Sequence, residues 1–549
     1  MSSGGVHILA LLLAGSVVFL PNLGQELHVD GREARHAEIS RAMVETGDYL
    51  VPSVFGRPYI DKPPLYNWCA AALFRLTGRV TFALARLPSA VAAIAAALGI
   101  YVLGRRWFSP RAGIVASIVW MTSWLVIEWG RLSRMDMMFA TLVLYALVLA
   151  DIAARARAGW RRSMVCLGSA ALVGAATMSK GPLALFFFAV GLVGIWRARR
   201  GRWIPSPFLL SGAILASLAA LGGWLWLAER GHPGHFRALF DYQFGQGFVE
   251  HPKRQFLYFD QLLLRTAPWG IFAAGASRWV FRDWRRNGFT CETVPAFVLI
   301  VCLVVMTIVQ NKRAHYILPA LPMWALFLGG FIDRAVARRT QSAPAGEGTP
   351  ADPPAWGFDW PLRVALIGLS IVGLLSPFAW WTFARGGRLA GTAVSVTVAV
   401  VAGVGAAFAW RGKASRAFLM FIVALVVGFA SVYPLVLPHF YRASPDGAAV
   451  ASIARAVPAG LPVADYGVRN EYLSFKLNRH IVYVGTIEDL IRFLAAQPRC
   501  CVLIPTDRVP ALVEKAARPV RVLCTCRLDK DEVSVVLSDP EAESRAQDG

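Results

Sequence analysis

The chain has 549 residues, of which 56% are hydrophobic and only 16% are charged, and its mean hydropathy is +0.50. This composition excludes a soluble globular protein and is typical of a polytopic membrane protein. The formal net charge of +22 does not indicate nucleic-acid binding, because the arginines cluster between apolar segments, as in the cytoplasmic loops of membrane proteins.

The first apolar segment covers residues 5–24. It has no Lys or Arg before it and no clear small-residue cleavage site after it, so we expect a retained membrane helix and not a signal peptide. A densely charged stretch, residues 30–66, follows. An ionised side chain at the centre of a bilayer costs at least roughly 2.5–3.5 kcal/mol. We therefore expect this stretch at the membrane interface or in a water-filled cavity.

The first half of the charged stretch predicts an amphipathic helix over residues 33–46. Arg41 is spaced to pair with Glu38 and Glu45 on one helix face, and Gly47 is a suitable C-cap. The second half is rich in proline and predicts extended or turning backbone. A solvated connecting loop is the simpler alternative. Against it stands the crowding of ionisable side chains: Asp30, Glu33, Arg35, His36, Glu38, Asp61 and Lys62.

Thirteen segments are apolar over the roughly 20 residues that a spanning helix needs. They are 5–24, 82–104, 110–128, 133–154, 162–178, 181–198, 206–228, 261–281, 293–310, 315–337, 360–384, 389–411 and 416–437. Segment 65–78 is too short to span, and we expect an interfacial or re-entrant helix there. With the N-terminus inside, the short inner loops and adjoining span ends contain 21 Lys and Arg, whereas the outer ones contain seven. This asymmetry follows the positive-inside rule. It puts residues 25–81, 229–260 and the C-terminal tail outside, which in a Gram-negative bacterium is the periplasm.

Several ionisable residues remain on the outer side. Each one alone could be an anchor that extends to the membrane interface. Together, cations and a carboxylate at one face indicate a site for an anion such as a phosphate, with the carboxylate as a candidate general base. They are Arg131, Arg134 and Asp136 near the start of one span, Lys180 between two spans, and Lys312, Arg313, His315 and Tyr316 before another.

After Pro438 the composition changes to alternating β-rich and helical runs. The β-rich runs are LPVADY, HIVYVG, CCVLIPT, VRVLCTC and VSVVLS, and helices are expected near 471–477, 487–496 and 511–517. This pattern predicts a small α/β domain, residues 439–549, after a membrane domain, residues 1–438, that contains the 25–81 loop. The domain has no GxGxxG or P-loop pattern. Its four cysteines could form disulfides in an oxidising compartment, but packed thiols are the favoured interpretation.

The order of outer motifs resembles the lipid A aminoarabinose transferase family, GT-C integral membrane glycosyltransferases distantly similar to protein O-mannosyltransferases. The resemblance covers roughly residues 1–340 by motif, and the rest matches in layout alone. The matching positions are Glu33, Arg35, His36, Ala37, Glu38, Ile39, Arg41 and Met43; Gly47 to Pro52; Gly56, Tyr59, Asp61, Lys62 and Pro63; Asp136; Met178 to Gly181; and Lys312 with Tyr316 to Pro319.

The resemblance implies an all-α GT-C membrane domain of about 13 transmembrane helices, with periplasmic juxtamembrane helices and the small C-terminal α/β domain. It implies transfer, with inversion, of a hexosyl or pentosyl group from a polyprenyl-phosphate donor. The acceptor would be a lipid such as lipid A, a glycan or a protein. The enzyme would lie in a bacterial inner membrane, with its active site and C-terminus in the periplasm.

The resemblance also implies roles for single residues. Asp136 carries over as an active-site carboxylate, whereas Glu33 and Asp30 compete for the position of a second one. Lys62 is the closest match to a ligand of the lipid phosphate. The remaining donor-binding candidates are Arg35, His36, Tyr59, Arg131, Arg134, Lys180, Lys312, Arg313 and Tyr316. Some relatives bind a divalent metal ion. Asp61 fits the first ligand of such a site, and His251 lies off the expected register for another.

Two other functions are compatible with parts of the sequence. A polyprenyl-glycan transporter or flippase could use the same basic cavity, but we find neither inverted repeats nor charges in the middle of several spans. A structural scaffold would account for the spans but not for the outer carboxylates. The sequence therefore favours a membrane glycosyltransferase, and it does not identify the sugar.

Overall fold

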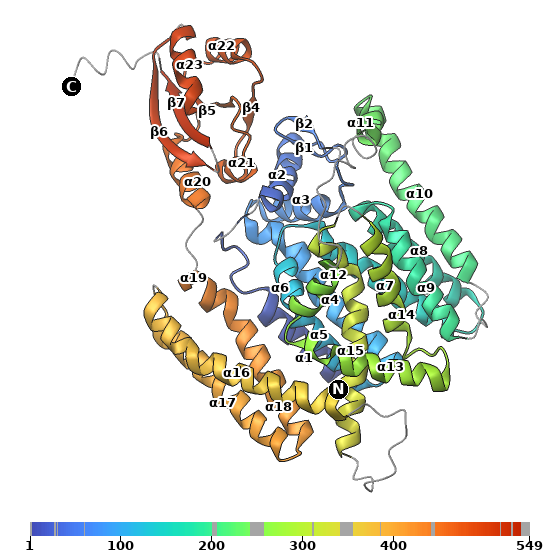
Figure 1. Cartoon of the computed structure of the whole chain (residues 1–549). Coiled ribbons are helices and arrows are strands. Elements are labelled where there is room, and N and C mark those ends of the chain that lie inside the picture. Colours follow the sequence, from blue (N-terminus) through green and yellow to red (C-terminus); the bar gives the residue numbers. More distant parts are fainter. Residues whose placement is uncertain are drawn as a thin grey trace. The chain divides into compact units, whose positions relative to one another are not determined.

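The computed structural model describes residues 3–26, 29, 31–59, 61–199, 206–241, 257–309, 312–340, 355–384, 386–440, 445–516, 518–528 and 531–539. The chain folds into two compact units. We call residues 1–23, 61–66 and 86–440 the membrane unit, and residues 24–60, 67–85 and 441–549 the αβ unit. Figure 1 shows the course of the chain through both.

The membrane unit is helical throughout its described part. Eight described helices are long and apolar enough to span a membrane, and the pair α5–α6, bent by 66°, makes a ninth if it is one span. With the three shorter apolar helices α1, α9 and α14, twelve of the thirteen expected spans have a helical counterpart. The helices are α1 (Ser3–Phe19), α4 (Phe82–Trp107), α5 (Pro110–Met121), α6 (Trp124–Gly130), α7 (Met135–Arg155), α8 (Trp160–Lys180), α9 (Leu183–Ala198), α10 (Ser206–Gly231), α14 (Val294–Ile308), α15 (Leu321–Thr340), α16 (Ala355–Phe383), α17 (Arg388–Trp410) and α18 (Ala414–Ser431).

The expected span at 261–281 is wrong as a single helix. The chain forms the short helix α12 (Leu257–Leu264), the 3₁₀ helix η2 (Trp269–Phe272) and then α13 (Ala273–Asn287). Between α12 and η2, Thr266 bonds back to the carbonyl of Leu262, and Trp324 of α15 donates to the same hydroxyl at 3.1 Å. α13 carries four arginines and is amphipathic. An average hydropathy over this window does not register the break.

A polar cluster marks one end of the helix bundle. Asp151, near the C-terminus of α7, is fully buried. It accepts hydrogen bonds from Arg106 Nε at 2.6 Å, Trp107 Nε1 at 3.1 Å and Arg199 Nη2 at 3.2 Å. Arg155 approaches it to 3.4 Å. Arginines from three segments that the loop charges assign to the inner side thus converge on one carboxylate. We call this end of the helix bundle the Asp151 end.

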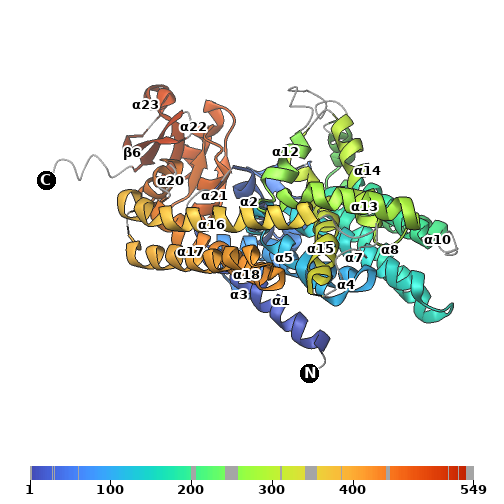
Figure 2. The ribbon, with the colours of Figure 1, turned by 60° about the horizontal axis from the view of Figure 1, so that its bottom comes forward.

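The helices α16, α17 and α18 lie side by side, as Figure 2 shows. The contact between the first two is close. A Cβ added at Gly373 of α16 would lie 2.7 Å from the carbonyl oxygen of Ser395 and 2.7 Å from the backbone nitrogen of Ala399 on α17. Only glycine allows the two backbones to approach this closely, which is common where helices pack in membranes.

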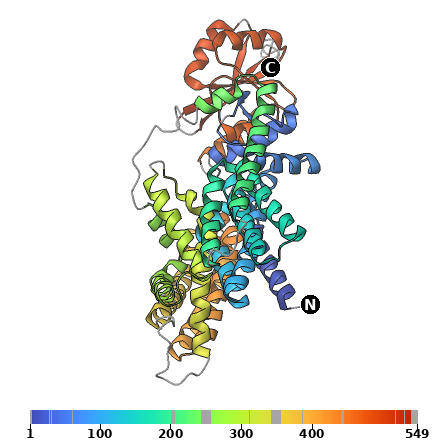
Figure 3. The ribbon, with the colours of Figure 1, turned by 90° about the vertical axis from the view of Figure 1, so that its right-hand side faces the viewer.

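The αβ unit contains a five-stranded sheet of order β4-β3-β5-β7-β6, in which β3 is parallel to β4 and β5 and β7 is antiparallel to β5 and β6. This C-terminal part is coloured orange to red in Figure 3. Its elements match the expected runs. They are α20 (Pro445–Ala456), β3 (Val463–Asp465), α21 (Glu471–Leu477), β4 (Ile481–Tyr483), α22 (Ile487–Ala496), β5 (Cys500–Pro505), α23 (Val509–Lys515), β6 (Val520–Leu528) and β7 (Asp531–Ser538). All eight cysteines of the chain are free thiols.

The αβ unit also takes in most of the loop after α1. The loop forms α2 (Gly31–Thr46), the two-stranded hairpin β1 (Ser53–Val54) and β2 (Arg57–Pro58), and α3 (Leu65–Thr77), and Gly47 caps α2 with a φ of +73°. The helices at 33–46 and 65–78 are thereby confirmed as helices. Phe82 packs on Phe475 with ring centroids 4.4 Å apart, and Ala34 and Ala37 belong to the same apolar core as the sheet. The structure thus divides the chain differently from the proposed boundary at 438/439.

Candidate active site

Asp136 lies in the first turn of α7, where a carboxylate is favoured by the positive end of the helix dipole. Its side chain is 4% exposed and pairs with the ammonium of Lys180, which ends α8, where a cation is favoured. One ion pair thus joins the N-terminus of α7 to the C-terminus of α8. A buried pair of this kind holds both side chains in one geometry.

His315 completes this pair from the 3₁₀ helix η3 (Ala314–Ala320) that precedes α15. Its Nε2 lies 3.7 Å from Asp136 Oδ1. The imidazole stacks on Trp129 with ring centroids 4.1 Å apart and meets Tyr316 edge-on at 4.9 Å. The Lys180 ammonium in turn lies 4.7 Å from the centre of the Tyr316 ring. Aromatic rings therefore fix the orientation of both partners of Asp136.

Further cations surround this group, and we call the region the Asp136 end. Arg134 is buried, acts electrostatically on Asp136, and places its guanidinium 4.7 Å from the centre of the Trp129 ring. Lys312 is 5% exposed, and no described residue pairs with its ammonium. An ammonium that no protein group uses is available to bind an anion by charge-assisted hydrogen bonds. The neighbouring Arg313 is half-buried, and its backbone forms a hydrogen bond with the side chain of Tyr258.

Arg131 has a different task from the one expected. Its guanidinium donates to the carbonyl oxygens of Phe19 at 2.7 Å, Val18 at 3.2 Å and Pro21, at the end of α1. It also lies 3.7 Å from the centre of the Tyr433 ring. Most of its donors are therefore used within the protein, which assigns Arg131 to packing of α1 and leaves it little capacity for a substrate anion.

Lys62 and Asp61 pair with each other in the membrane unit. The Lys62 ammonium contacts the Asp61 carboxylate and donates to its backbone carbonyl at 3.0 Å, and both side chains are partly exposed. Asp61 therefore faces a cation. Among the described residues no group of three or more His, Cys, Asp or Glu could hold a metal ion. His251 and Asp30 lie outside the described residues. The described residues therefore do not supply a set of ligands that fits a metal ion.

The remaining candidates belong to α2 and its surroundings in the αβ unit. Glu33 is fully buried in the first turn of α2. Arg35 forms an ion pair with Glu471 of α21 at 2.7 Å. His36 is buried and meets Tyr59 edge-on, with ring centroids 6.1 Å apart. Glu33, Arg35 and His36 lie on α2, whereas Tyr59 follows β2. Arg35 is held by α21 of the same unit.

The acidic and basic residues at the centre of the α2 motif are also internal partners. Arg41 binds both oxygens of Glu38 at 2.7 Å and reaches Glu45 at 2.8 Å, which confirms the pairing expected from their helical spacing. The Ser474 hydroxyl donates to Glu38 at 2.7 Å. Burial opposes the charge of Arg41, but the two carboxylates outweigh it and raise the pKa of Arg41. This network positions α2 and uses the carboxylates of Glu38 and Glu45 within the protein.

Sequence reasoning did not link two residues of the Asp136 end to the Asp136 carboxylate. His315 belongs to the 312–316 segment that is expected near an anion, but nothing in its spacing links it to Asp136. Trp129 lies in the bent helix α6 and reads in sequence as an ordinary apolar residue; its buried indole N–H has no partner among the described residues. A contact between segments almost 180 positions apart leaves no local signal.

Comparison with known proteins shows what the chain is similar to in sequence and in fold. Residues 61–226 match the family model described as dolichyl-phosphate-mannose-protein mannosyltransferase. The crystal structure of ArnT from Cupriavidus metallidurans bound to undecaprenyl phosphate superposes with a TM-score of 0.71 at 18% identity, over 98% of both chains. The chain has the ArnT fold. The expected resemblance and fold class, a GT-C membrane domain with a small C-terminal α/β domain, are therefore confirmed.

Curated relatives match over a shorter range. The undecaprenyl phosphate-α-4-amino-4-deoxy-L-arabinose arabinosyl transferase of Edwardsiella ictaluri is 30% identical over 317 residues, which are 55% of each chain. The corresponding protein of Proteus mirabilis, number 2, is 27% identical over 338 residues, 60% of this chain and 59% of its own. The matched part thus spans between half and two thirds of these relatives. All of them are named as transferases with a lipid-phosphate-linked sugar.

Proposed function

We propose that the chain is an integral membrane glycosyltransferase that moves a sugar from a polyprenyl-phosphate donor to a cell-envelope acceptor with inversion. The observation that carries the proposal is the Asp136 end, where a buried carboxylate is held between Lys180 and His315. Lys312, three residues before His315, is also mostly buried, and no described residue pairs with its ammonium. The named activities of the curated relatives point to the same reaction class. The bilayer is the third partner, because the donor is a lipid.

The charged residues suit both the departure of the donor phosphate and the attack of the acceptor. As the anomeric carbon leaves the donor, negative charge grows on the polyprenyl phosphate oxygen, and Lys312, Arg134 or Lys62 can bind that phosphate by charge-assisted hydrogen bonds. The acceptor oxygen attacks from the opposite face and forms the new bond to the anomeric carbon as the bond to phosphate breaks. With a hydroxyl acceptor, Asp136 takes its proton.

An acceptor that is already a phosphate needs no such base. Asp136 would then serve to orient Lys180 and His315, and its removal would weaken binding more than it slows chemistry. The relatives act with a 4-amino-4-deoxy-L-arabinose donor, so a pentosyl group is the first sugar to test and a hexosyl group the second. Glu33, Arg35, His36 and Tyr59 on the αβ unit are the remaining candidates for substrate contacts.

We also propose that the Asp136 end and the αβ unit face the periplasm of a bacterial inner membrane. The Asp136 end contains the segments assigned to the side with seven cations, and the Asp151 end those on the side with 21. Polyprenyl-linked sugars in the outer leaflet would then have direct access to the carboxylate.

Purified protein in liposomes with a polyprenyl-phosphate sugar and an acceptor lipid tests the proposal. We expect product with wild type and a loss of at least roughly a hundredfold with Asp136→Asn, which matches the contribution of a general base. Binding of the donor lipid should persist in this variant. A transporter would move the donor between leaflets and form no product, and that result would overturn the proposal.

A further inference from the structure

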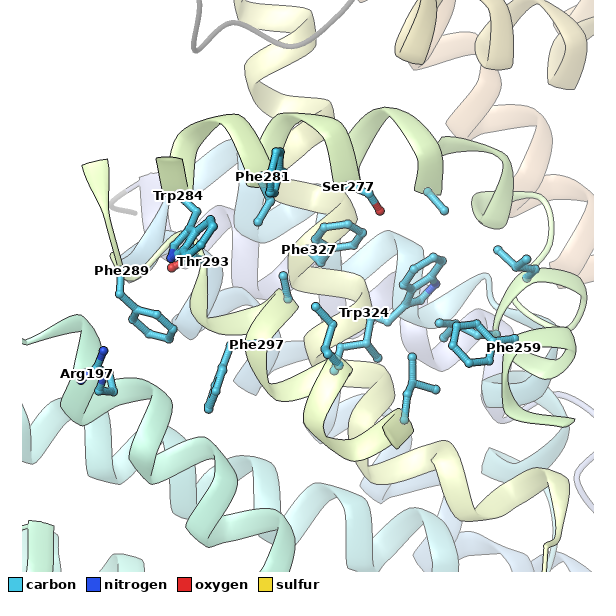
Figure 4. Close-up of a pocket in the computed structure, with 18 of the residues that line it drawn as sticks. Arg197, Phe259, Ser277, Phe281, Trp284, Phe289, Thr293, Phe297, Trp324 and Phe327 are labelled. Carbon is cyan, nitrogen blue, oxygen red and sulfur yellow. The ribbon is translucent and has the colours of Figure 1, made fainter. Parts of the chain in front are cut away.

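An apolar groove opens between α12, α13 and α14 in the membrane unit. Its volume is about 890 Å³, near the upper end of the roughly 300–1,000 Å³ common for ligand pockets. Figure 4 shows Phe281, Trp284 and Phe297 around it, with Arg197 and Phe289 at one end and Phe259 at the other. Two of the lining residues, Thr293 and Leu303, lie ten positions apart on the α14 segment, so the groove follows this helix for about 15 Å.

One wall of the groove is the amphipathic helix α13. Ser277, Val280, Phe281 and Trp284 line the groove and share one face by helical spacing. The arginines at 278, 282, 285 and 286 fall on the flank and the opposite face by the same spacing. Aromatic residues on one side and arginines on the other are typical of a helix that lies in the membrane interface. α13 therefore brings a lipid headgroup region and an apolar groove together.

The groove ends on a single cation. Arg197, at the C-terminal end of α9, lines the groove and is exposed, and no described residue pairs with it. Two residues later Arg199 binds Asp151 at 3.2 Å, so the cationic mouth of the groove lies at the Asp151 end of the bundle. This is the opposite end of α7 from Asp136, about 22 Å away along the helix axis.

We propose that this groove binds an anionic phospholipid, with an acyl chain in the apolar part and the headgroup phosphate on Arg197. Charge complementarity selects the occupant, because Arg197 lies at the mouth and α13 carries four more arginines on its flank and opposite face. Each basic residue near a membrane surface favours anionic lipid about fivefold. The polyprenyl donor does not suit the mouth, since its phosphate belongs at the Asp136 end. The groove thus serves a lipid of the other leaflet.

The test measures lipids that stay bound to the intact protein by native mass spectrometry. Protein is transferred into nanodiscs with equal amounts of phosphatidylglycerol and phosphatidylcholine, with and without undecaprenyl phosphate. Arg197→Gln removes the headgroup contact, and its matched control, Arg157→Gln, removes an exposed arginine between α7 and α8. Ser277→Phe fills the groove, and Ser211→Phe places the same side chain on the exposed surface of α10.

We expect wild type and both control variants to retain phosphatidylglycerol over phosphatidylcholine. Arg197→Gln should lower this preference about fivefold, and Ser277→Phe should reduce total retained lipid. Equal retention of both lipids by the wild-type protein would mean that the groove holds boundary lipid without selecting its headgroup, and this result would overturn the proposal. Retention of undecaprenyl phosphate in place of phosphatidylglycerol, with loss in Arg197→Gln, would also overturn it, because the groove would then hold the donor.

Discussion

Asp136 and Asp151 stand near opposite ends of one helix, α7, and each is the centre of a cationic cluster. Their separation of about 22 Å along the axis is somewhat less than the roughly 30 Å hydrocarbon thickness of a bilayer. Lys180, Arg134 and His315 surround the first, and Arg106 and Arg199 bind the second. The cations that the loop pattern sorted into two groups thus meet at two separate places in the bundle.

The division of the cations between the two ends of α7 leads to a prediction of membrane topology. Alkaline phosphatase fused after Gly47 or after Asp446 should be active, because both sites belong to the αβ unit on the side with few cations. A fusion after Arg157, at the Asp151 end, should be inactive and serves as the control. An inactive fusion after Asp446 would contradict the assigned orientation.

The buried pair of Asp136 and Lys180 should couple energetically. Lys180→Met leaves a buried carboxylate without its main cation, which costs roughly 3–5 kcal/mol, so the melting temperature in detergent should fall clearly. The double variant Asp136→Asn, Lys180→Met should melt above the value expected from adding the two single effects. Lys413→Met, an exposed lysine at the start of α18, should leave the melting temperature unchanged. Strict additivity would show that the pair does not interact.

Local patterns predicted the elements well. Apolar runs indicated twelve of the spans, and alternating runs located every strand of the C-terminal sheet, because burial of one face or both imposes those periods. The pairing of Arg41 with Glu38 and Glu45 also followed from helical spacing. These features depend on residues close together in the chain.

Long-range contacts were not accessible in the same way. Arg35 matched a family motif, but its partner Glu471 lies 436 positions away, and only the folded chain brings them together. Arg131 has the charge expected of a phosphate ligand, yet it is used on the carbonyls of α1. At the break between α12 and α13, Trp324 of α15 donates a hydrogen bond to Thr266, a long-range contact that hydropathy does not register.

Arg41 should matter for stability more than for chemistry. Arg41→Met leaves Glu38 buried without its cation, and we expect a loss of roughly 3–5 kcal/mol in the stability of the αβ unit. Arg35→Met is the matched control, because its pair with Glu471 is 39% exposed on the arginine side and should contribute about 1 kcal/mol or less. Hydrogen exchange of α2 measures both. Equal protection in the two variants would argue against a structural network.

The αβ unit should also respond to pH through Asp465. Burial raises the pKa of Asp465 to about 6, against backbone hydrogen bonds from Arg469 and Val468 that lower it. A carboxyl with a raised folded-state pKa favours folding below its ordinary pKa, and this contribution is lost as pH rises through about 6. Two pKa units correspond to roughly 3 kcal/mol. Hydrogen exchange in β3, corrected for intrinsic rates, should therefore show lower protection at pH 7 than at pH 4.5.

Asp465→Asn is the control for this effect. The amide has no proton to release, so the difference in protection of β3 between pH 4.5 and pH 7 should disappear. A wild-type protein whose protection rises with pH over this interval would have the opposite linkage and would contradict the assignment to Asp465.

Lys312 should separate stability from function. The Lys312 residue is 5% exposed and its ammonium has no described partner, so Lys312→Met removes no protein contact and should leave the melting temperature nearly unchanged. The same change removes a ligand of the donor phosphate and should raise the KM for the polyprenyl donor at least about tenfold. Lys62→Ala, which breaks a partly exposed pair with Asp61, should raise this KM with no gain in melting temperature. If Lys312→Met lowers the melting temperature and leaves the KM unchanged, Lys312 is a structural cation and the phosphate must be bound elsewhere.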